Sequence, residues 1–196
     1  MSDTKDREVS VPSEEEVEKE RKRLEYQKRY HRTLRSTIYI LLVVAAIAVL
    51  LATLLLPVLK VSGTSMEPTL QDEDIVMLMK KKNFKTGDLC GFYWQNKLLL
   101  KRIIGGPGDY IDIKDDGTVY VNGEKLDEPY VSELSVGTCN IEFPYQVPDG
   151  QYFVLGDHRA TSVDSRSTTI GCVEANQIVG KVILRIWPFK RIGGIH

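Results

Sequence analysis

The turn-rich segment at residues 61–70 carries a serine that could act as a nucleophile. Gly63 permits tight backbone curvature and Pro68 prevents regular strand or helix, so Ser65 between them lies on a turn. A hydroxyl held on a turn, beside free backbone N–H groups, can attack a carbonyl and stabilise the resulting oxyanion. Most serines in Gly/Pro loops are simply loop residues, so this segment alone does not establish catalysis.

Lys101 is a candidate general base for such a serine. It follows the apolar run at residues 98–100 and precedes a second apolar pair at residues 103–104. Burial against apolar surface favours the neutral amine, which can accept the proton of a serine hydroxyl. The alternative is a lysine at the end of a strand whose amine reaches water.

Residues 156–166 form a third polar segment, which is dense in hydroxyl, carboxylate and guanidinium groups. Its candidate residues are Asp157, Ser162, Asp164 and Arg166. Such a composition is typical of a hydrogen-bonded loop that supports a catalytic site, and it is equally typical of a polar surface loop.

Motifs of other enzyme classes are absent from the sequence. A Ser-His-Asp triad would have to use His158, and the sequence has no G-x-S-x-G motif. It also has no H-E-x-x-H metal motif, no Walker A loop and no G-x-G-x-x-G dinucleotide motif. We therefore expect no metal ion and no cofactor.

A long apolar segment precedes all three polar segments. Residues 38–59 contain no charged side chain over 22 positions. As a helix they would extend about 33 Å, enough to cross a hydrocarbon core of about 30 Å. The apolar core of a cleaved secretion signal is shorter and lies nearer the N-terminus. The segment is therefore predicted to be a stable transmembrane helix.

The charges that flank this segment indicate its orientation. Residues 19–35 hold eight lysines and arginines against two glutamates, whereas residues 60–75 hold Lys60 as their only cation. The positive-inside tendency places the N-terminal side in the cytoplasm. We expect a charged cytoplasmic tail at residues 1–37, in which Ser13 and Glu16 predict a helix-capping box, and an extracytoplasmic domain at residues 60–196.

The hydropathy pattern of residues 60–196 predicts β-strands. Short apolar runs recur between turn signals and predict strands at residues 75–79, 89–94, 98–104, 110–113, 119–121, 152–155 and 178–186. Asn122-Gly123 is a strong hairpin signal, because a type I′ turn needs two residues with positive φ. No helix longer than two turns is expected after residue 59. The predicted fold class is mainly β: a β-rich domain, barrel-like or sandwich-like, tethered by one N-terminal helix.

The charge balance argues against one class of partner, and the cysteine spacing leaves the state of the thiols open. The chain has 26 Lys+Arg and 27 Asp+Glu, a net charge of −1, which argues against a nucleic-acid partner. Its three cysteines show no C-x-x-C pair, and the sequence leaves open both one disulfide and three buried thiols.

The aromatic run at residues 92–94 either dips into a membrane interface or forms an internal cluster.

The three polar segments, in this order and after an N-terminal anchor, resemble the boxes of bacterial type I signal peptidases. These are Ser/Lys endopeptidases of exported preproteins, and the matching stretches read SGTSMEPTL, KRIIGGPGD and GDHRATSVDSR. The single span and the short outer domain resemble the Gram-positive branch. Relatives in the endoplasmic reticulum carry histidine at the position of Lys101, so the lysine indicates the bacterial type.

The resemblance implies roles for the residues of the first two boxes. Ser65 would be the nucleophile and its N–H one oxyanion donor, and Lys101 would be the general base and later the acid. Ser162 would hydrogen-bond the Lys101 amine. Some family members carry a hydroxyl where this chain has Gly63, so the second oxyanion donor stays open.

The resemblance also implies supporting roles. Asp157, Asp164 and Arg166 would form a salt-bridge network under the site. Met66 would belong to the wall of the substrate pocket, with a place in the hydrophobic core as the alternative. His158 stands where many relatives have asparagine, which we interpret as a neutral change.

The function implied is removal of N-terminal signal peptides from exported preproteins after small residues in an Ala-x-Ala-like pattern, at the bacterial plasma membrane. The substrate would bind as an added β-strand. The expected partners are signal peptides and the lipid bilayer, with no nucleic acid. Two alternatives remain: a self-cleaving Ser/Lys repressor-like protein, and a membrane-tethered β-domain that binds without catalysis.

Overall fold

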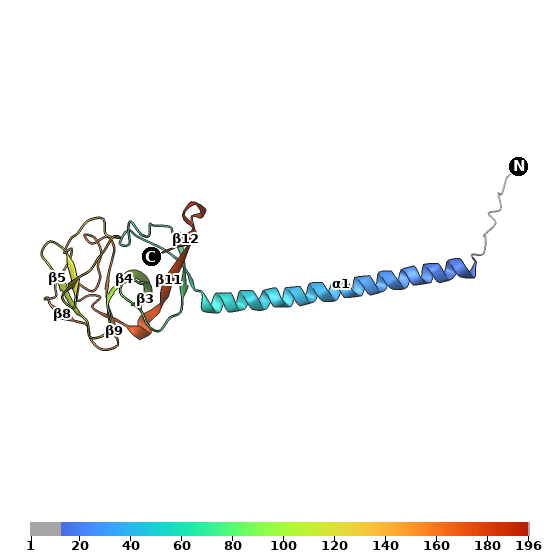
Figure 1. Cartoon of the computed structure of the whole chain (residues 1–196), viewed down its shortest axis with the longest axis horizontal. Coiled ribbons are helices and arrows are strands. Elements are labelled where there is room, and N and C mark those ends of the chain that lie inside the picture. The colour runs from blue at the N-terminus through green and yellow to red at the C-terminus, as the bar shows by residue number, and fades with distance from the viewer. Residues whose placement is uncertain (1–12, 196) are drawn as a thin grey trace. The chain divides into compact units, whose positions relative to one another are not determined.

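Helix α1 (Glu14–Leu55) opens the computed structural model, which describes residues 13–195 (Figure 1). The predicted capping box is confirmed, because Glu16 N–H donates to Ser13 Oγ at 3.3 Å and Ser13 N–H donates to the Glu16 carboxylate at 3.0 Å. Among the described residues, α1 is the one helix long and apolar enough to cross a membrane. The residues from Thr53 onward form a separate compact unit.

The helix ends earlier than the sequence predicts. Its last residue is Leu55 rather than residue 59, and Val58–Lys60 forms strand β1. Pro57 causes the difference, because proline has no N–H to donate to the helix and disfavours helical conformation in the residue before it. The C-terminal boundary of the predicted helix, 38–59, is therefore corrected to Leu55.

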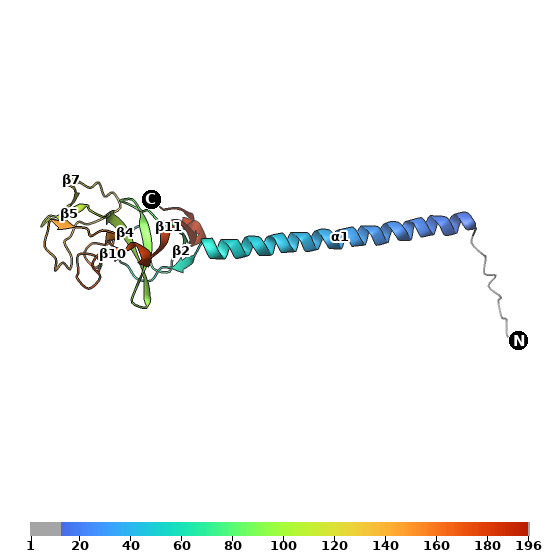
Figure 2. The same cartoon turned by 90° about the horizontal axis from the view of Figure 1, so that it is seen from below.

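The unit after α1 contains two antiparallel sheets. The first has the order β1-β2-β11-β3-β4-β9-β10, with β12 pairing β11, and the second has the order β7-β6-β5-β8. The remaining strands of the first sheet are β2 (Ile75–Met79), β3 (Leu89–Trp94), β4 (Lys97–Gly105), β9 (Gln151–Leu155), β10 (Val173–Glu174), β11 (Ile178–Trp187) and β12 (Gly193–Gly194). Those of the second are β5 (Tyr110–Ile113), β6 (Val119–Val121), β7 (Glu124–Lys125) and β8 (Tyr145–Gln146). Within this unit β5 and β11 lie at opposite ends (Figures 1 and 2).

All seven predicted strands are present. β2, β3, β5 and β6 have the predicted bounds, and β4, β9 and β11 are longer by one or two residues. The predicted hairpin joins β6 to β7, with φ of 54° at Asn122 and 83° at Gly123. Between Leu55 and residue 195 the only helices are the three-residue 3₁₀ turns η1 (Ala175–Gln177) and η2 (Phe189–Arg191), as expected.

Three apolar clusters form the core of the β unit. One packs the loop after β1 onto β2, β3 and β11, a second lies between β3, β4 and β9, and the third joins β9 to the second sheet. Phe92 is buried in the second cluster and Trp94 packs against it, so the internal alternative holds for these two aromatic residues. The three cysteines are free thiols, with Cys90 in this same cluster.

Candidate active site

Ser65 lies in the loop that connects β1 to β2. The base of the loop is closed by backbone hydrogen bonds from Val61 N–H to Asp74 O at 2.7 Å and from Glu73 N–H to Val61 O at 3.1 Å. Gly63 has φ of +91°, a conformation that side chains rarely adopt. Its N–H donates to Asp72 Oδ1 at 2.8 Å, which fixes the turn before Ser65.

The loop is anchored from below by apolar side chains. Met66 and Leu70 are 2% and 0% exposed and belong to the first core cluster. Met66 also borders a cavity of about 80 Å³ beside Ser65. The structure therefore places Met66 in the core, which was the alternative for this residue, and at the edge of the candidate site as well.

Lys101 reaches the serine from β4. Its Nζ donates a hydrogen bond to Ser65 Oγ at 2.8 Å, although the two residues lie 36 positions apart. Burial lowers the pKa of Lys101 from 10.5 to about 8, an effect that the Asp164 carboxylate opposes and the Arg166 guanidinium reinforces. The neutral amine is thus accessible near neutral pH, as a lysine that accepts a proton from a hydroxyl requires.

Asp164 and Arg166 form one buried ion pair. Arg166 Nε donates to Oδ1 and Nη2 donates to Oδ2, each at 2.8 Å, and both side chains are fully buried. Arg166 also donates to four backbone carbonyls, those of Ser135, Val136, Arg159 and Ser162. The Asp164 carboxylate also accepts the backbone N–H groups of Gly156 at 3.0 Å and of Arg166 at 3.3 Å. Such complete hydrogen bonding compensates the burial of the two charges.

Asp157 belongs to a different ion pair from the one predicted. Arg102 donates to it from Nε at 2.9 Å and from Nη2 at 2.8 Å, in a bidentate arrangement. Thr69 Oγ1, in the loop of the nucleophile, donates to the same carboxylate at 2.5 Å. The single network expected for Asp157, Asp164 and Arg166 is therefore two separate pairs, and Arg102 is a site residue that sequence reasoning missed.

Ser162 does not make the hydrogen bond to the Lys101 amine that the resemblance implies. Its Oγ is buried and has no hydrogen-bond partner within residues 13–195, so the predicted contact with Lys101 is not formed. The neighbouring Gly156 leaves no room for a side chain, because a Cβ there would overlap with Ser162 Oγ and lie 2.6 Å from Ser65 O. His158 N–H donates to the same Ser65 carbonyl at 3.1 Å.

One backbone donor at the nucleophile is unoccupied. The Ser65 N–H has no acceptor in the part of the chain that the structure describes, whereas the Gly63 N–H is engaged by Asp72. The free N–H can therefore stabilise an oxyanion that forms on a carbonyl attacked by Ser65.

An open strand edge adjoins the serine. β4 pairs with β3 along residues 97–102, but its pairing with β9 begins only at Arg102. Residues 97–101 consequently have one unpaired edge in the described structure, and four of them line the cavity beside Ser65. An extended peptide can pair with such an edge through main-chain hydrogen bonds.

Two further contacts around the site also escaped the sequence analysis. Arg159 lies in the third polar segment and pairs with the Glu128 carboxylate through both terminal nitrogens, with side chains that are 1% and 5% exposed. Tyr130 places its ring 3.7 Å from the Arg102 guanidinium. The adjacency of Arg102 to Lys101 was the one local signal, and nothing in the local sequence marked Glu128 or Tyr130.

Comparison with known proteins supports a peptidase. Residues 34–187 match the family described as Signal peptidase, peptidase S26. The chain is 35% identical over 165 residues to Signal peptidase I of Bacillus licheniformis, covering 78% of this chain and 88% of that protein. It is 38% identical over 150 residues to Signal peptidase IB of Staphylococcus aureus strain Mu50, covering 66% and 77%. A crystal structure of a signal peptidase I from Enterococcus faecalis V583 aligns with a TM-score of 0.43 at 30% identity, covering 52% of this chain and 98% of the other.

Proposed function

The chain belongs to the S26 family of signal peptidases, serine peptidases that remove signal peptides at the membrane, and we propose that Ser65 and Lys101 perform this cleavage. The observation that carries the assignment is the hydrogen bond of 2.8 Å from Lys101 Nζ to Ser65 Oγ. Lys101 is only 3% exposed, so its amine is shielded from water at the point where it meets the hydroxyl.

The first step forms a covalent intermediate. Neutral Lys101 accepts the Ser65 proton as Oγ attacks the scissile carbonyl, and the Ser65 N–H stabilises the negative oxygen that develops. Collapse of the tetrahedral species breaks the C–N bond, and Lys101 returns the proton to the departing amine. The acyl-enzyme then reacts with water, with Lys101 again as the base.

The buried groups around Lys101 support these proton transfers. The Asp157 and Asp164 carboxylates raise the pKa of Lys101 and so stabilise the ammonium that forms transiently. Ser162 Oγ lies against Gly156 and has no hydrogen-bond partner among the residues that the structure describes. We assign it to the orientation of the Lys101 amine after the lysine has taken the serine proton.

The substrate pairs with the open edge of β4. Its chain lies extended along residues 97–101, and side chains near the scissile bond enter the cavity of about 80 Å³ that Met66 helps to line. A cavity of this size suits small side chains, which supports cleavage after an Ala-x-Ala-like sequence. Larger side chains would have to displace buried core residues.

We infer the cellular placement of the chain from the composition of α1 and of the segments beside it. We assign residues 1–37 to the cytoplasm and the apolar part of α1 to the bacterial plasma membrane, because the cations gather before the apolar segment. Residues 60–196 would then be extracytoplasmic. Ser65 follows Leu55 by ten residues, at most about 35 Å of extended chain, so cleavage takes place near the lipid bilayer.

Cleavage of a purified preprotein by the full-length protein in detergent tests the assignment. Wild type should cut after a small residue, and Ser65→Ala and Lys101→Met should reduce cleavage to background while their thermal unfolding remains cooperative. Cleavage by Ser65→Ala would show that the nucleophile is misassigned. Absence of cleavage by folded wild type would support the membrane-tethered binding domain instead.

A further inference from the structure

Residues 126–134, which we call the strap, follow β7 without regular secondary structure. Two of its side chains, Glu128 and Tyr130, contact the buried arginines Arg159 and Arg102. We propose that the strap is a positioning element of the active site, with Tyr130 and Glu128 holding these two arginines and, through them, Lys101 and Gly156. The inference rests on the proposed function of Ser65 and Lys101.

Tyr130 acts on the strand of the base. Its ring covers the guanidinium of Arg102, the residue that directly follows Lys101 on β4, at 3.7 Å from the ring centroid. Arg102 is 1% exposed and binds Asp157 and the Gly87 carbonyl. An aromatic face over a desolvated guanidinium is attractive and keeps water from its ion pair.

Glu128 acts on the segment that contacts the nucleophile. Its carboxylate pairs with Arg159, whose Nε donates to Gly156 O at 3.1 Å. The carbonyl of Arg159 accepts a hydrogen bond from Arg166 at 2.9 Å. Tyr130 Oη donates to Glu128 at 3.0 Å, so the two strap side chains support each other.

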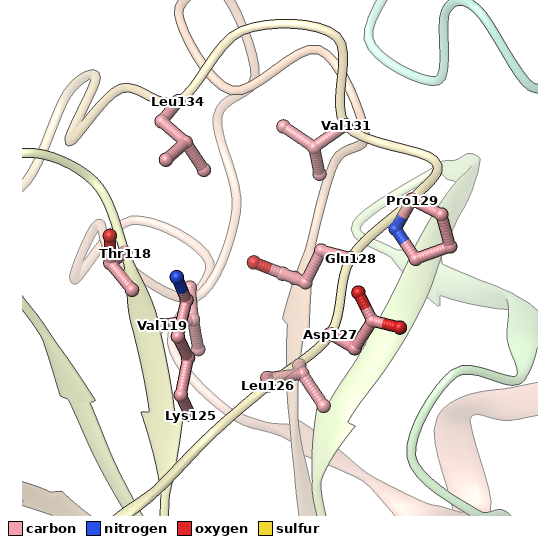
Figure 3. A pocket seen from close by; sticks show the side chains of 9 residues that line it. All are labelled: Thr118, Val119, Lys125, Leu126, Asp127, Glu128, Pro129, Val131 and Leu134. Carbon is pink, nitrogen blue, oxygen red and sulfur yellow. The ribbon is translucent and has the colours of Figure 1, made fainter.

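A pocket adjoins the strap, and Glu128 is one of the residues that line it. The pocket has a volume of about 520 Å³, and the strap curves around it from Leu126 to Leu134, with Thr118 and Val119, the first residue of β6, also lining it (Figure 3). Close packing therefore does not fix the strap from the side of the pocket. The start of the strap is held by Leu126, whose N–H donates to Val119 O at 2.9 Å and whose side chain packs against the third core cluster. Beyond Leu126, the contacts of Glu128 and Tyr130 with the two arginines hold it.

A purely stabilising strap and a positioning strap predict different pH profiles. The groups that face Lys101 are Asp157, Asp164 and Arg166 from one segment and Cys90 from β3. Loss of the Tyr130 ring would admit water to the Arg102–Asp157 pair and loosen it, so that Arg102 would neutralise less of the Asp157 carboxylate, which raises the Lys101 pKa. The pH midpoint of cleavage would then rise, whereas a loss of stability alone would leave the midpoint unchanged.

Two substitutions at Tyr130 distinguish the contribution of the aromatic ring from that of the hydroxyl. Tyr130→Met keeps apolar bulk without an aromatic face, and Tyr130→Phe keeps the face without the hydroxyl. In the full-length protein in detergent, we expect Tyr130→Met to lower kcat roughly tenfold with little change in KM, and to raise the pH midpoint by roughly half a unit. Tyr130→Phe should stay within roughly threefold of wild type. Tyr110→Met, the same change at an exposed tyrosine of β5, should behave as wild type.

A charge substitution tests the second contact. Glu128→Gln leaves the Arg159 guanidinium buried without its carboxylate, so Gly156 should lose its fixed position and kcat should fall roughly tenfold. Asp127→Asn is the matched control, because Asp127 is exposed, lines the same pocket and has no ion pair in the described structure. It should retain wild-type kcat.

The proposal is overturned if Tyr130→Met and Glu128→Gln lower only the melting temperature and keep the kcat and pH midpoint of wild type. If Tyr130→Met does not fold, the proposal is decided by comparing the kcat and pH midpoint of Glu128→Gln with those of the control Asp127→Asn. Failure of the proposed function is distinguishable, since it requires either that folded wild type does not cleave or that Ser65→Ala or Lys101→Met still cleaves. If Ser65→Ala is inactive while the strap variants keep the kcat and pH midpoint of wild type, the proposed function stands and only the proposal for the strap fails.

Discussion

Asp157 and Arg102 form a bidentate ion pair, with N–O distances of 2.9 and 2.8 Å and both side chains 1% exposed. Arg102 directly follows Lys101 on β4. Asp157 directly precedes His158, whose backbone N–H binds the Ser65 carbonyl. The pair therefore joins the strand of the proposed base to the segment that contacts the nucleophile, and Thr69 links it to the nucleophile loop.

Asp157→Asn should be strongly destabilising. The change leaves the Arg102 guanidinium buried without a charged partner, which typically costs about 3–5 kcal/mol. Urea unfolding of the full-length protein in detergent at neutral pH measures the loss in the free energy of unfolding. Arg102→Met combined with Asp157→Leu removes both charges, so this double variant should be more stable than the sum of the losses measured for Arg102→Met alone and Asp157→Leu alone implies, by more than about 1 kcal/mol. Additive losses would show that the two side chains are not coupled.

Cleavage should increase with pH because the neutral form of Lys101 is the proposed base. Burial lowers its pKa to about 8, so kcat/KM should rise through a midpoint near that value. The neighbouring Cys90 does not confuse the assignment, since burial raises the pKa of its thiol well above its ordinary range. Measurement of kcat/KM from about pH 6 to about pH 10 tests this, and a flat profile would argue against a lysine base.

Lys101→Met should stabilise the protein at neutral pH while it abolishes cleavage. The pKa of Lys101 falls from 10.5 in the unfolded chain to about 8 in the folded one, so the folded state disfavours the ammonium by about 3 kcal/mol. This cost is fully present below pH 8 and disappears as pH rises toward 10.5, because the amine is then neutral in both states. The difference in the free energy of unfolding between variant and wild type should therefore decrease over this interval. A difference that stays constant with pH would contradict the argument.

The strands were predictable because their signals are local. Each of the seven runs has Gly, Pro, Asn or Asp within two residues of at least one of its ends, and Asn122-Gly123 alone specifies the turn between β6 and β7. The two-residue strands β8, β10 and β12 were missed, because two residues show no periodicity. The position of β11 between β2 and β3 depends on pairing between distant parts of the chain, which no local pattern encodes.

The residues of the candidate site likewise fall into those with a local sequence signal and those without one. Ser65 and Lys101 were predicted as a pair because each lies in a recognisable box, and the structure brings the two side chains into contact. The partner of Asp157 was not predictable, because Arg102 lies 55 residues away and meets it only through the pairing of β4 with β9. Glu128 and Tyr130 carry no local signal at all. Their buried contacts become visible only once the strap is placed beside Arg102 and Arg159.

Gly156→Ala should disable the site with a single methyl group. The added Cβ would overlap with Ser162 Oγ and lie 2.6 Å from Ser65 O, so either the segment or the nucleophile loop must shift. A displacement of about 1 Å at the reacting groups can cost roughly 100-fold in rate, and overpacking typically costs about 1–3 kcal/mol of stability. Cleavage assays and thermal unfolding measure the two effects. Gly193→Ala is the matched control, because a Cβ at Gly193 meets nothing within 4 Å.

The second substitution Ser162→Gly separates the two clashes. Added to Gly156→Ala, it removes the overlap with the serine side chain and should recover part of the lost stability. The contact with the Ser65 carbonyl remains, since it is made by the backbone, so cleavage should stay low. Full recovery of activity in this double variant would show that the position of the Ser65 backbone does not limit the reaction.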